Sequence, residues 1–231
     1  MAADGRHSTQ TANHILENWT YANAAARTGA TGFTSADLGK VAYQTDTGAY
    51  YRLTATTPTW VAVAGSGAQA MPQLFWTAPQ GYPPAASYAT FDTRNSIPVL
   101  DFDAAVDESV IFAGRLPSTY AGGGITVDIY WMATSATSGT CRWLAAWERE
   151  DLATDHDANA FAAVQGTGGA APGTSGFAQK TSIAFTNGAQ MDSTAAGEPF
   201  RLLVTRDGDG STGTDDMAGD AELMYVAVRE T

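Results

Sequence analysis

Eight runs of strand-forming residues divide residues 85–231, and polar stretches separate them. The runs span residues 88–93, 97–102, 109–116, 125–134, 141–150, 180–186, 200–206 and 222–229. Within the fourth run, apolar and polar residues alternate, which places Ile125, Val127 and Ile129 on one face of a strand. Eight such strands are the number that a jelly-roll sandwich uses. We therefore predict an all-β fold with Val127 and Ile129 in its core.

The last run leaves the phase of its strand open, because apolar residues stand at consecutive positions. Two core-facing sets are compatible with it: Leu223 with Tyr225, or Met224 with Val226 and Val228. Two polar stretches, residues 163–179 and 207–220, interrupt the series. Because they are rich in glycine and small polar residues, we predict that both are surface loops.

A smaller strand pattern occupies residues 33–65. Thr34 can cap a helical turn that Gly39 ends in the left-handed conformation. Residues 40–53 then predict a hairpin, and residues 60–63 a third strand. A meander of this size cannot bury both of its faces, so we expect other surfaces to complete it.

The segments on either side of the meander are less regular. Before it, Ile15, Trp19, Ala22 and Ala26 stand at helical spacing. A helical stripe that docks on a larger partner and a frayed tail are both compatible with this pattern. After it, small residues and then an aromatic, Pro-rich stretch predict a linker followed by an extended segment, residues 66–84.

The charge of the chain excludes some partners. Its 12 Lys and Arg against 24 Asp and Glu give a formal net charge of −12. Such a surface repels phosphate backbones, so we expect no nucleic acid partner. No apolar run approaches the roughly 20 residues of a membrane span, and the first residues lack the pattern of an export signal. Cys141 has no second cysteine for a disulfide. We expect a soluble protein whose fold is stabilised by packing and not by disulfide bonds.

Five carboxylates are candidates for the paired acids of a glycosidase: Asp101, Asp103, Asp128, Glu148 and Glu150. Two of them, Asp101 and Asp103, are two positions apart on a predicted strand, as are Glu148 and Glu150. That spacing places both members of each pair on one face, most simply the solvent face. The chain also lacks a nucleophile elbow, a P-loop and a dinucleotide fingerprint. We predict no catalytic residues, no cofactor and no enzyme.

The acidic loop near the C-terminus is a candidate for calcium. Asp207, Asp209 and Ser211 correspond to the first ligands of an EF-hand loop. Thr212 and Ala218, however, stand where that loop needs glycine and glutamate. We predict a solvated loop without metal and leave calcium binding open.

A second acidic stretch surrounds His156 and comprises Asp151, Asp155 and Asp157. Ligands at successive positions point in divergent directions, which disfavours a metal site. We predict an exposed turn.

Large aromatic residues are the remaining candidates for binding. Trp131, Trp143 and Trp147, together with Tyr130, could form a platform that stacks on a sugar ring. Trp143 and Trp147 stand four positions apart, on one face of a predicted strand. Packing between two sheets is the more common role of such residues. The full set of candidate binding residues is Trp19, Tyr51, Trp60, Trp143 and Trp147.

Four stretches carry a resemblance to known proteins. The first two are ADLGKVAYQTDTGAYYRL at residues 36–53 and PTW at residues 58–60. They are similar to a small β module of bacteriophage fibre and tail proteins. The other two are FRLLVTRD at residues 200–207 and GDAELMYV at residues 219–226. They resemble jelly-roll head domains of phage structural proteins. The resemblance implies a homotrimer, because such proteins assemble about threefold axes.

Together these observations lead to a non-enzymatic bacteriophage virion structural protein. We expect a short trimeric fibre, spike or decoration protein on the capsid or tail surface, bound to capsid or tail proteins, with a host-surface glycan as a further candidate partner. The alternative is a carbohydrate-binding module that uses exposed aromatic residues. The predicted parts are an N-terminal attachment segment (1–32), a β-meander trimerisation module (33–65), a linker with an extended segment (66–84) and a jelly-roll β-sandwich domain (85–231).

Overall fold

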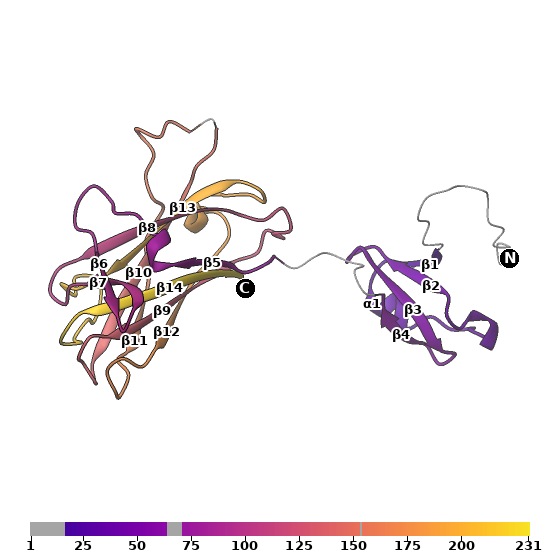
Figure 1. Ribbon diagram of the computed structural model, residues 1–231. Helices are drawn as coiled ribbons and strands as arrows, with labels where there is room; N and C mark the ends of the chain where they lie inside the picture. Colours follow the sequence, from indigo (N-terminus) through magenta and orange to yellow (C-terminus); the bar gives the residue numbers. More distant parts are fainter. Residues whose placement is uncertain (1–16, 64–70, 153) are drawn as a thin grey trace. The chain divides into compact units, whose positions relative to one another are not determined.

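Figure 1 shows a chain built mainly of β-strands, which divides into two compact units, residues 1–69 and 70–231. The computed structural model describes residues 17–63, 71–152 and 154–231. The first unit contains β1 (Glu17–Tyr21), α1 (Ala24–Thr28), η1 (Ser35–Asp37), β2 (Val41–Gln44), β3 (Ala49–Ala55) and β4 (Thr59–Ala62). The second contains β5 (Leu74–Thr77), η2 (Ala78–Gln80), β6 (Thr90–Arg94), β7 (Ile97–Phe102), β8 (Glu108–Arg115), β9 (Ile125–Ala133), β10 (Thr140–Arg149), β11 (Gln165–Ala170), β12 (Gln179–Phe185), η3 (Ala189–Met191), β13 (Pro199–Arg206) and β14 (Ala221–Glu230). No described helix has the length and apolar character needed to cross a membrane.

The first unit contains the predicted meander. Among the described residues its sheet has the order β1-β2-β3-β4, and the hairpin of β2 and β3 buries Leu53 completely. The predicted capped turn is present as η1, where the Asp37 carboxylate accepts the Thr34 backbone N–H at 2.9 Å. Gly39 follows with a φ of +88°, in the left-handed region. The local signals for this part of the fold are confirmed.

The segment before the meander differs from its predicted pattern. Trp19 lies on β1, which pairs in parallel with β2, and the helix α1 begins only at Ala24. The helical stripe through Trp19 is therefore wrong, because pairing with an open strand edge fixes these residues in an extended conformation. Ile15, the first residue of that stripe, lies outside the described residues.

The second unit is a sandwich of two sheets, which confirms the all-β, jelly-roll-like fold class. Within its described residues one sheet has the order β11-β10-β13-β8, and the larger sheet has the order β12-β9-β14-β7-β6. The inner faces meet in one aromatic core, where Trp143 on β10 lies 5.0 Å from Phe102 on β7, centroid to centroid. Val127 and Ile129 are fully buried in this core, as predicted.

Both predicted core-facing sets of the last strand, β14, contribute residues to the core. The register of β14 against β9 shifts between Leu223 and Tyr225. Leu223 therefore points into the core before the shift, and Val226 and Val228 do so after it. Leu223 of the first set and Val226 and Val228 of the second face the core, whereas Tyr225 and Met224 do not, because one extra residue at a β-bulge exchanges the two faces of a strand.

In the second unit, two strands lie outside the eight predicted runs. Residues 74–77 of the predicted extended segment form β5, which pairs with β14, so the second unit's sheet begins before residue 85. Residues 165–170 of the first predicted loop form β11, which pairs with β10. Both strands lack the alternating apolar pattern on which strand prediction depends.

Candidate functional site

Three predicted binding residues of the first unit lie together around Arg27. The Arg27 guanidinium lies 3.5 Å from the ring centroid of Tyr51, and its Nε donates to Gln44 Oε1 at 2.8 Å. Trp19 and Trp60 meet edge to face with centroids 5.8 Å apart. These contacts stabilise the small sheet, and binding through these rings stays a prediction.

The other two predicted residues, Trp143 and Trp147, have no exposed surface. Trp147 stacks on Phe200 with centroids 3.9 Å apart, and its Nε1 donates to Thr194 Oγ1 at 3.0 Å. Trp143 packs against Phe102 of the opposite sheet. The prediction that these two tryptophans bind a ligand is wrong, because the interior of the sandwich covers their rings.

The carboxylates weighed for glycosidase chemistry do not share a cleft. Glu148 is fully buried on the outer face of its sheet and accepts from Arg201 Nη2 at 2.5 Å. Asp128 and Asp101 lie on the outer face of the other sheet. Asp128 forms an ion pair with Arg229 at 3.2 Å, and burial, reinforced by neighbouring carboxylates, raises the pKa of Asp101 to about 6. Glu150 pairs with the same Arg201, at 3.3 Å, so one cation holds Glu148 and Glu150 on one outer face, and Asp128 and Asp101 lie on the other.

The acidic loop after β13 is held by its own carboxylates. Asp207 is fully buried, accepts from Thr212 Oγ1 at 2.7 Å and pairs with Arg142 at 3.3 Å. Oxygens of Asp107, Asp207 and Asp209 lie within 4.8 Å of one another. Because Asp207 is already bonded within the chain, the cluster has a structural role in shaping the loop, and calcium binding stays open.

The stretch around His156 is the exposed turn that was predicted. Asp155, His156 and Asp157 are all exposed in the loop after β10. Asp155 Oδ1 accepts the backbone N–H of Asp157 at 3.1 Å, which closes the turn locally.

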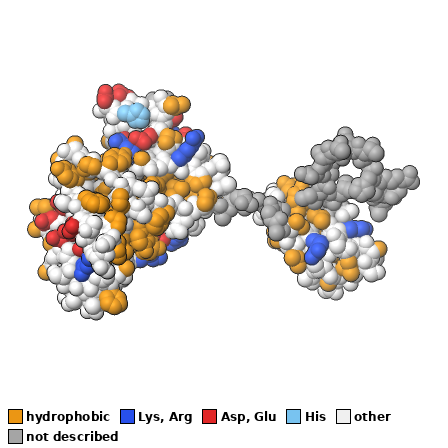
Figure 2. All heavy atoms as spheres, viewed as in Figure 1, with side chains coloured by type: hydrophobic (Ala, Val, Ile, Leu, Met, Phe, Trp, Pro, Cys, Tyr) orange, Lys and Arg blue, Asp and Glu red, His pale blue; other side chains and the backbone are white. Residues whose placement is uncertain are grey.

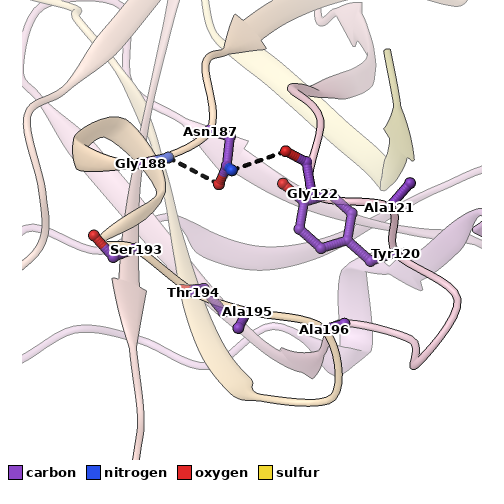
Figure 3. A pocket seen from close by; sticks show the side chains of 9 residues that line it. All are labelled: Tyr120, Ala121, Gly122, Asn187, Gly188, Ser193, Thr194, Ala195 and Ala196. Carbon is purple, nitrogen blue, oxygen red and sulfur yellow. Dashed lines mark hydrogen bonds between the residues drawn. The ribbon is translucent and has the colours of Figure 1, made fainter.

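A hollow of about 330 Å³ with a mixed polar and apolar lining lies between the loop after β8 and the loops around η3 (Figure 3). Asn187 holds it in shape, since its Nδ2 donates to the Gly122 carbonyl at 2.8 Å and its Oδ1 accepts from Gly188 N at 2.8 Å. The remaining lining consists mainly of small side chains, and no charged residue lines it. The hollow offers few groups that could select a ligand.

A second hollow, of about 230 Å³, is apolar and has an aromatic rim; we call it the aromatic groove. Its rim carries Tyr82, Tyr88 and Phe91, whose exposed fractions are 38, 53 and 57%. Buried Leu100 and Val110 lie beneath them. Figure 2 shows a broad band of hydrophobic side chains on the face of the second unit that β5, β6 and β7 cross. Exposed apolar surface of this kind commonly marks a site of interaction.

Backbone pairing to the edge of β8 places the rim residues. Tyr82 exchanges two hydrogen bonds with Ile111, of 3.0 and 2.9 Å, and Ala89 N donates to the Ser109 carbonyl at 3.1 Å. Gly81 lets the chain approach closely, because a Cβ there would lie 2.5 Å from Val110 Cγ2. The groove is therefore built on backbone that is fixed against the sandwich.

The aromatic residues that form this groove are visible in the sequence, but their pattern there predicts extended chain and a strand. The aromatic and Pro-rich composition of residues 71–84 predicted an extended segment along a sheet edge or a partner. Tyr88 and Phe91 lie in the predicted strand run of residues 88–93. Only the pairing of this segment with β8 brings the three rings to one opening.

Comparisons with known proteins give no match by sequence: no family model matches the chain, and no curated protein matches it. Solved structures match it by fold. The CBM36-1 domain of a multidomain xylanase from the hindgut metagenome of Trinervitermes trinervoides is 10% identical, with a TM-score of 0.40 over 69% of this chain and 98% of its own. A family 35 carbohydrate-binding module from an environmental isolate is 8% identical, with a TM-score of 0.41 over 68% of this chain and 97% of its own. A xylan-binding domain from Paenibacillus barcinonensis is 14% identical, with a TM-score of 0.39 over 66% of this chain and 92% of its own.

These findings correct the functional expectation. The structures that match by fold include carbohydrate-binding modules and glycoside hydrolase domains, and none of the comparisons points to a bacteriophage protein. The prediction of a virion structural protein, with its capsid and tail partners, is contradicted. At these identities and scores the likeness concerns the course of the strands alone.

Proposed function

We propose that this chain is a non-catalytic carbohydrate-binding protein whose second unit holds a sugar in the aromatic groove. The observation that carries the proposal is the exposure of three aromatic rings, Tyr82, Tyr88 and Phe91, around one apolar hollow. Flat aromatic faces pack well against the apolar faces of pyranose rings, and Tyr adds a polar end to the same ring. Water-exposed aromatic rings on a fixed backbone suit a sugar, because a sugar is mostly polar but has apolar ring faces.

Polar groups at the groove supply the hydrogen bonds that a sugar needs. Burial raises the pKa of Tyr82, so its hydroxyl stays protonated and can donate a hydrogen bond. The nearby charge of Arg201 lowers this pKa and that of Glu150 raises it, both by less than burial does. Ser109, which also lines the groove, carries a hydroxyl whose oxygen lies 2.7 Å from Thr205 Oγ1. A few polar groups in a mainly apolar hollow are typical of sites that orient a small ligand.

The size of the groove limits what it can enclose. Its volume of about 230 Å³ is below the range of about 300–1,000 Å³ that is usual for sites enclosing a drug-sized ligand. We therefore expect one sugar ring to occupy the groove while adjoining rings of a longer glycan lie across the rim.

Glycan binding and substitution of the rim test the proposal. The full chain is screened on an array of plant, bacterial and animal glycans, and the best ligand is measured by calorimetry. Tyr88→Ala and Phe91→Ala should each weaken binding about tenfold, because a buried aromatic side chain contributes about 1.5–3 kcal/mol and 1.4 kcal/mol is tenfold.

Phe177→Ala is the matched control, since Phe177 is an aromatic residue that is 66% exposed and does not line the groove. It should leave the affinity unchanged. Full affinity in both rim variants would refute the groove as the site. Release of reducing ends from the bound glycan would refute the non-catalytic part of the proposal.

Self-association is a separate expectation. The trimer expected from the sequence stays a prediction, and light scattering of the full chain at micromolar concentration tests it. A stable monomer would contradict it without affecting the glycan site.

A further inference from the structure

Three aromatic rings form a row on the outer face of the larger sheet, away from the aromatic groove. Tyr130 on β9 stacks on Tyr225 on β14 with centroids 4.4 Å apart and an interplanar angle of 27°. Phe75 on β5 continues the row at 5.0 Å from Tyr225. Phe75 is 52% exposed, and Thr77 beside it on β5 is exposed as well. We call Phe75, Tyr225 and Tyr130 the ring row; none of them lines the groove.

Two cations stand beside the ring row and share one buried carboxylate. Lys180 on β12 pairs across the strands with Tyr130, and its Nζ lies 3.7 Å from Asp128 Oδ1. Arg229 Nε lies 3.2 Å from Asp128 Oδ2. The Asp128 side chain is 3% exposed, whereas those of Lys180 and Arg229 are each 46% exposed. Asp128 therefore holds both cations in place while their outer atoms face water.

The charges on this part of the face do not balance. Two cations against one carboxylate leave one positive charge, in a protein whose net charge is −12. Within the described residues Arg229 uses only Nε, so its two terminal nitrogens have unused N–H donors. Farther along the same face Arg94 is neutralised by Glu222 at 2.7 Å. Asp101 lies opposite Glu222 there and adds a further carboxylate, so the positive excess is local to Lys180 and Arg229 and does not extend over the face.

We propose that this face is a second carbohydrate site, which binds a uronate-bearing glycan. One sugar ring lies against exposed Phe75, and the carboxylate of an adjoining uronate takes the free donors of Arg229 and Lys180. The planar guanidinium fork is complementary to a carboxylate. This inference shares with the proposed function the premise that the chain binds carbohydrate, but it uses different residues.

Aromatic rings beside cations also suit single-stranded nucleic acid, but the charge of the chain disfavours it. A nucleic acid strand needs a basic groove that tracks many phosphates. Here two cations stand in a surface of net negative charge. A sugar with a single carboxylate matches the single excess charge better.

The test compares an acidic with a neutral oligosaccharide of equal length. The full chain is titrated with trigalacturonate and with galactotriose by calorimetry. Binding of trigalacturonate should fall at least tenfold in the double variant Lys180→Gln, Arg229→Gln and about tenfold in Phe75→Ala. It should also weaken when the salt concentration rises, because exposed charges are screened. Galactotriose binding should not change in the double variant.

Arg52→Gln and Phe177→Ala are the controls, since both change exposed side chains outside the ring row and the groove. Both should leave both affinities unchanged. If the double variant proves unstable, amide chemical shifts of the unsubstituted chain decide: trigalacturonate should shift Tyr130 and Tyr225. Absence of trigalacturonate binding, shifts confined to the groove, or equal binding of a single-stranded oligonucleotide would overturn the inference. Failure of the groove variants alone would refute only the proposed function.

Discussion

Asp101 is a residue whose pKa is strongly changed by its surroundings in this protein. It stands on the outer face of β7, directly opposite Glu222 on β14 and Thr90 on β6. Its Oδ1 is buried and has no hydrogen-bond partner in the described residues. Burial is the main reason that its pKa rises to about 6, and the carboxylates of Asp220 and Glu222 add to the effect. The ionised form is thus disfavoured in the folded protein.

The pKa of Asp101 gives a signed prediction for stability against pH. Because the folded pKa of about 6 exceeds the ordinary 3.8, the ionisation of Asp101 costs stability as the pH rises through that interval. Asp101→Asn should therefore raise the melting temperature at pH 8, with a gain that shrinks toward pH 4. Thermal unfolding followed by circular dichroism at both pH values measures this. A gain that is independent of pH would assign the effect to packing instead.

At the scale of the element, β11 shows why a glycine-rich stretch can be a strand. It lies at the edge of its sheet against β10, and it also contacts β12 of the other sheet. A Cβ at Gly169 would lie 2.0 Å from Thr181 Oγ1, the atom that accepts from Trp131 Nε1 at 3.0 Å. Glycine here permits a close approach of two sheets, which composition alone cannot distinguish from a flexible loop.

Substitution of this glycine tests the close approach. Gly169→Ala should destabilise the second unit by about 1–3 kcal/mol, because overpacking displaces neighbouring atoms. Urea unfolding followed by tryptophan fluorescence measures the change. Gly173→Ala is the matched control, since nothing lies within 4 Å of a Cβ at Gly173. Equal stabilities of the two variants would contradict the packing role of Gly169.

At the scale of the whole sandwich, Arg206 joins the two sheets and the acidic loop. Its side chain and that of Asp215 are both completely buried, with Nη2 and Oδ1 2.9 Å apart. It also donates to the carbonyls of Phe102 on β7, Met217 and Gly219, at 3.2, 3.0 and 2.9 Å. Arginine has five N–H donors, so these contacts, with a second bond to Asp215 of 3.1 Å, use all of them.

Loss of this arginine should affect the whole second unit. Arg206→Met leaves the Asp215 carboxylate buried without its partner, which should cost about 3–5 kcal/mol of unfolding free energy. The double variant Arg206→Met, Asp215→Leu should recover part of that loss, because no unpaired charge remains. Urea unfolding measures both variants. A single variant as stable as the unsubstituted chain would show that solvent reaches Asp215.

Local signals were sufficient for most of the elements. All eight predicted runs of the second unit are strands, and the turn that Thr34 begins and Gly39 ends is present. These features depend on neighbours in sequence: alternation along one strand, a hydroxyl or carboxylate within three residues, a glycine at a positive φ. Each can therefore be predicted from a short window of the chain.

The candidate sites depend on contacts between distant segments. The spacing of Trp143 and Trp147 placed both on one face of β10, but the opposing sheet made that face the interior. Tyr82 and Tyr88 became a rim through pairing with β8, and Tyr130 met Phe75 only through β14. The sequence by itself determined most of the strands, because alternation is local, whereas β1, β5 and β11 form only through pairing with distant strands. The tertiary structure decided which aromatic faces are covered and which meet water, because sheet pairing joins residues that are far apart in the chain.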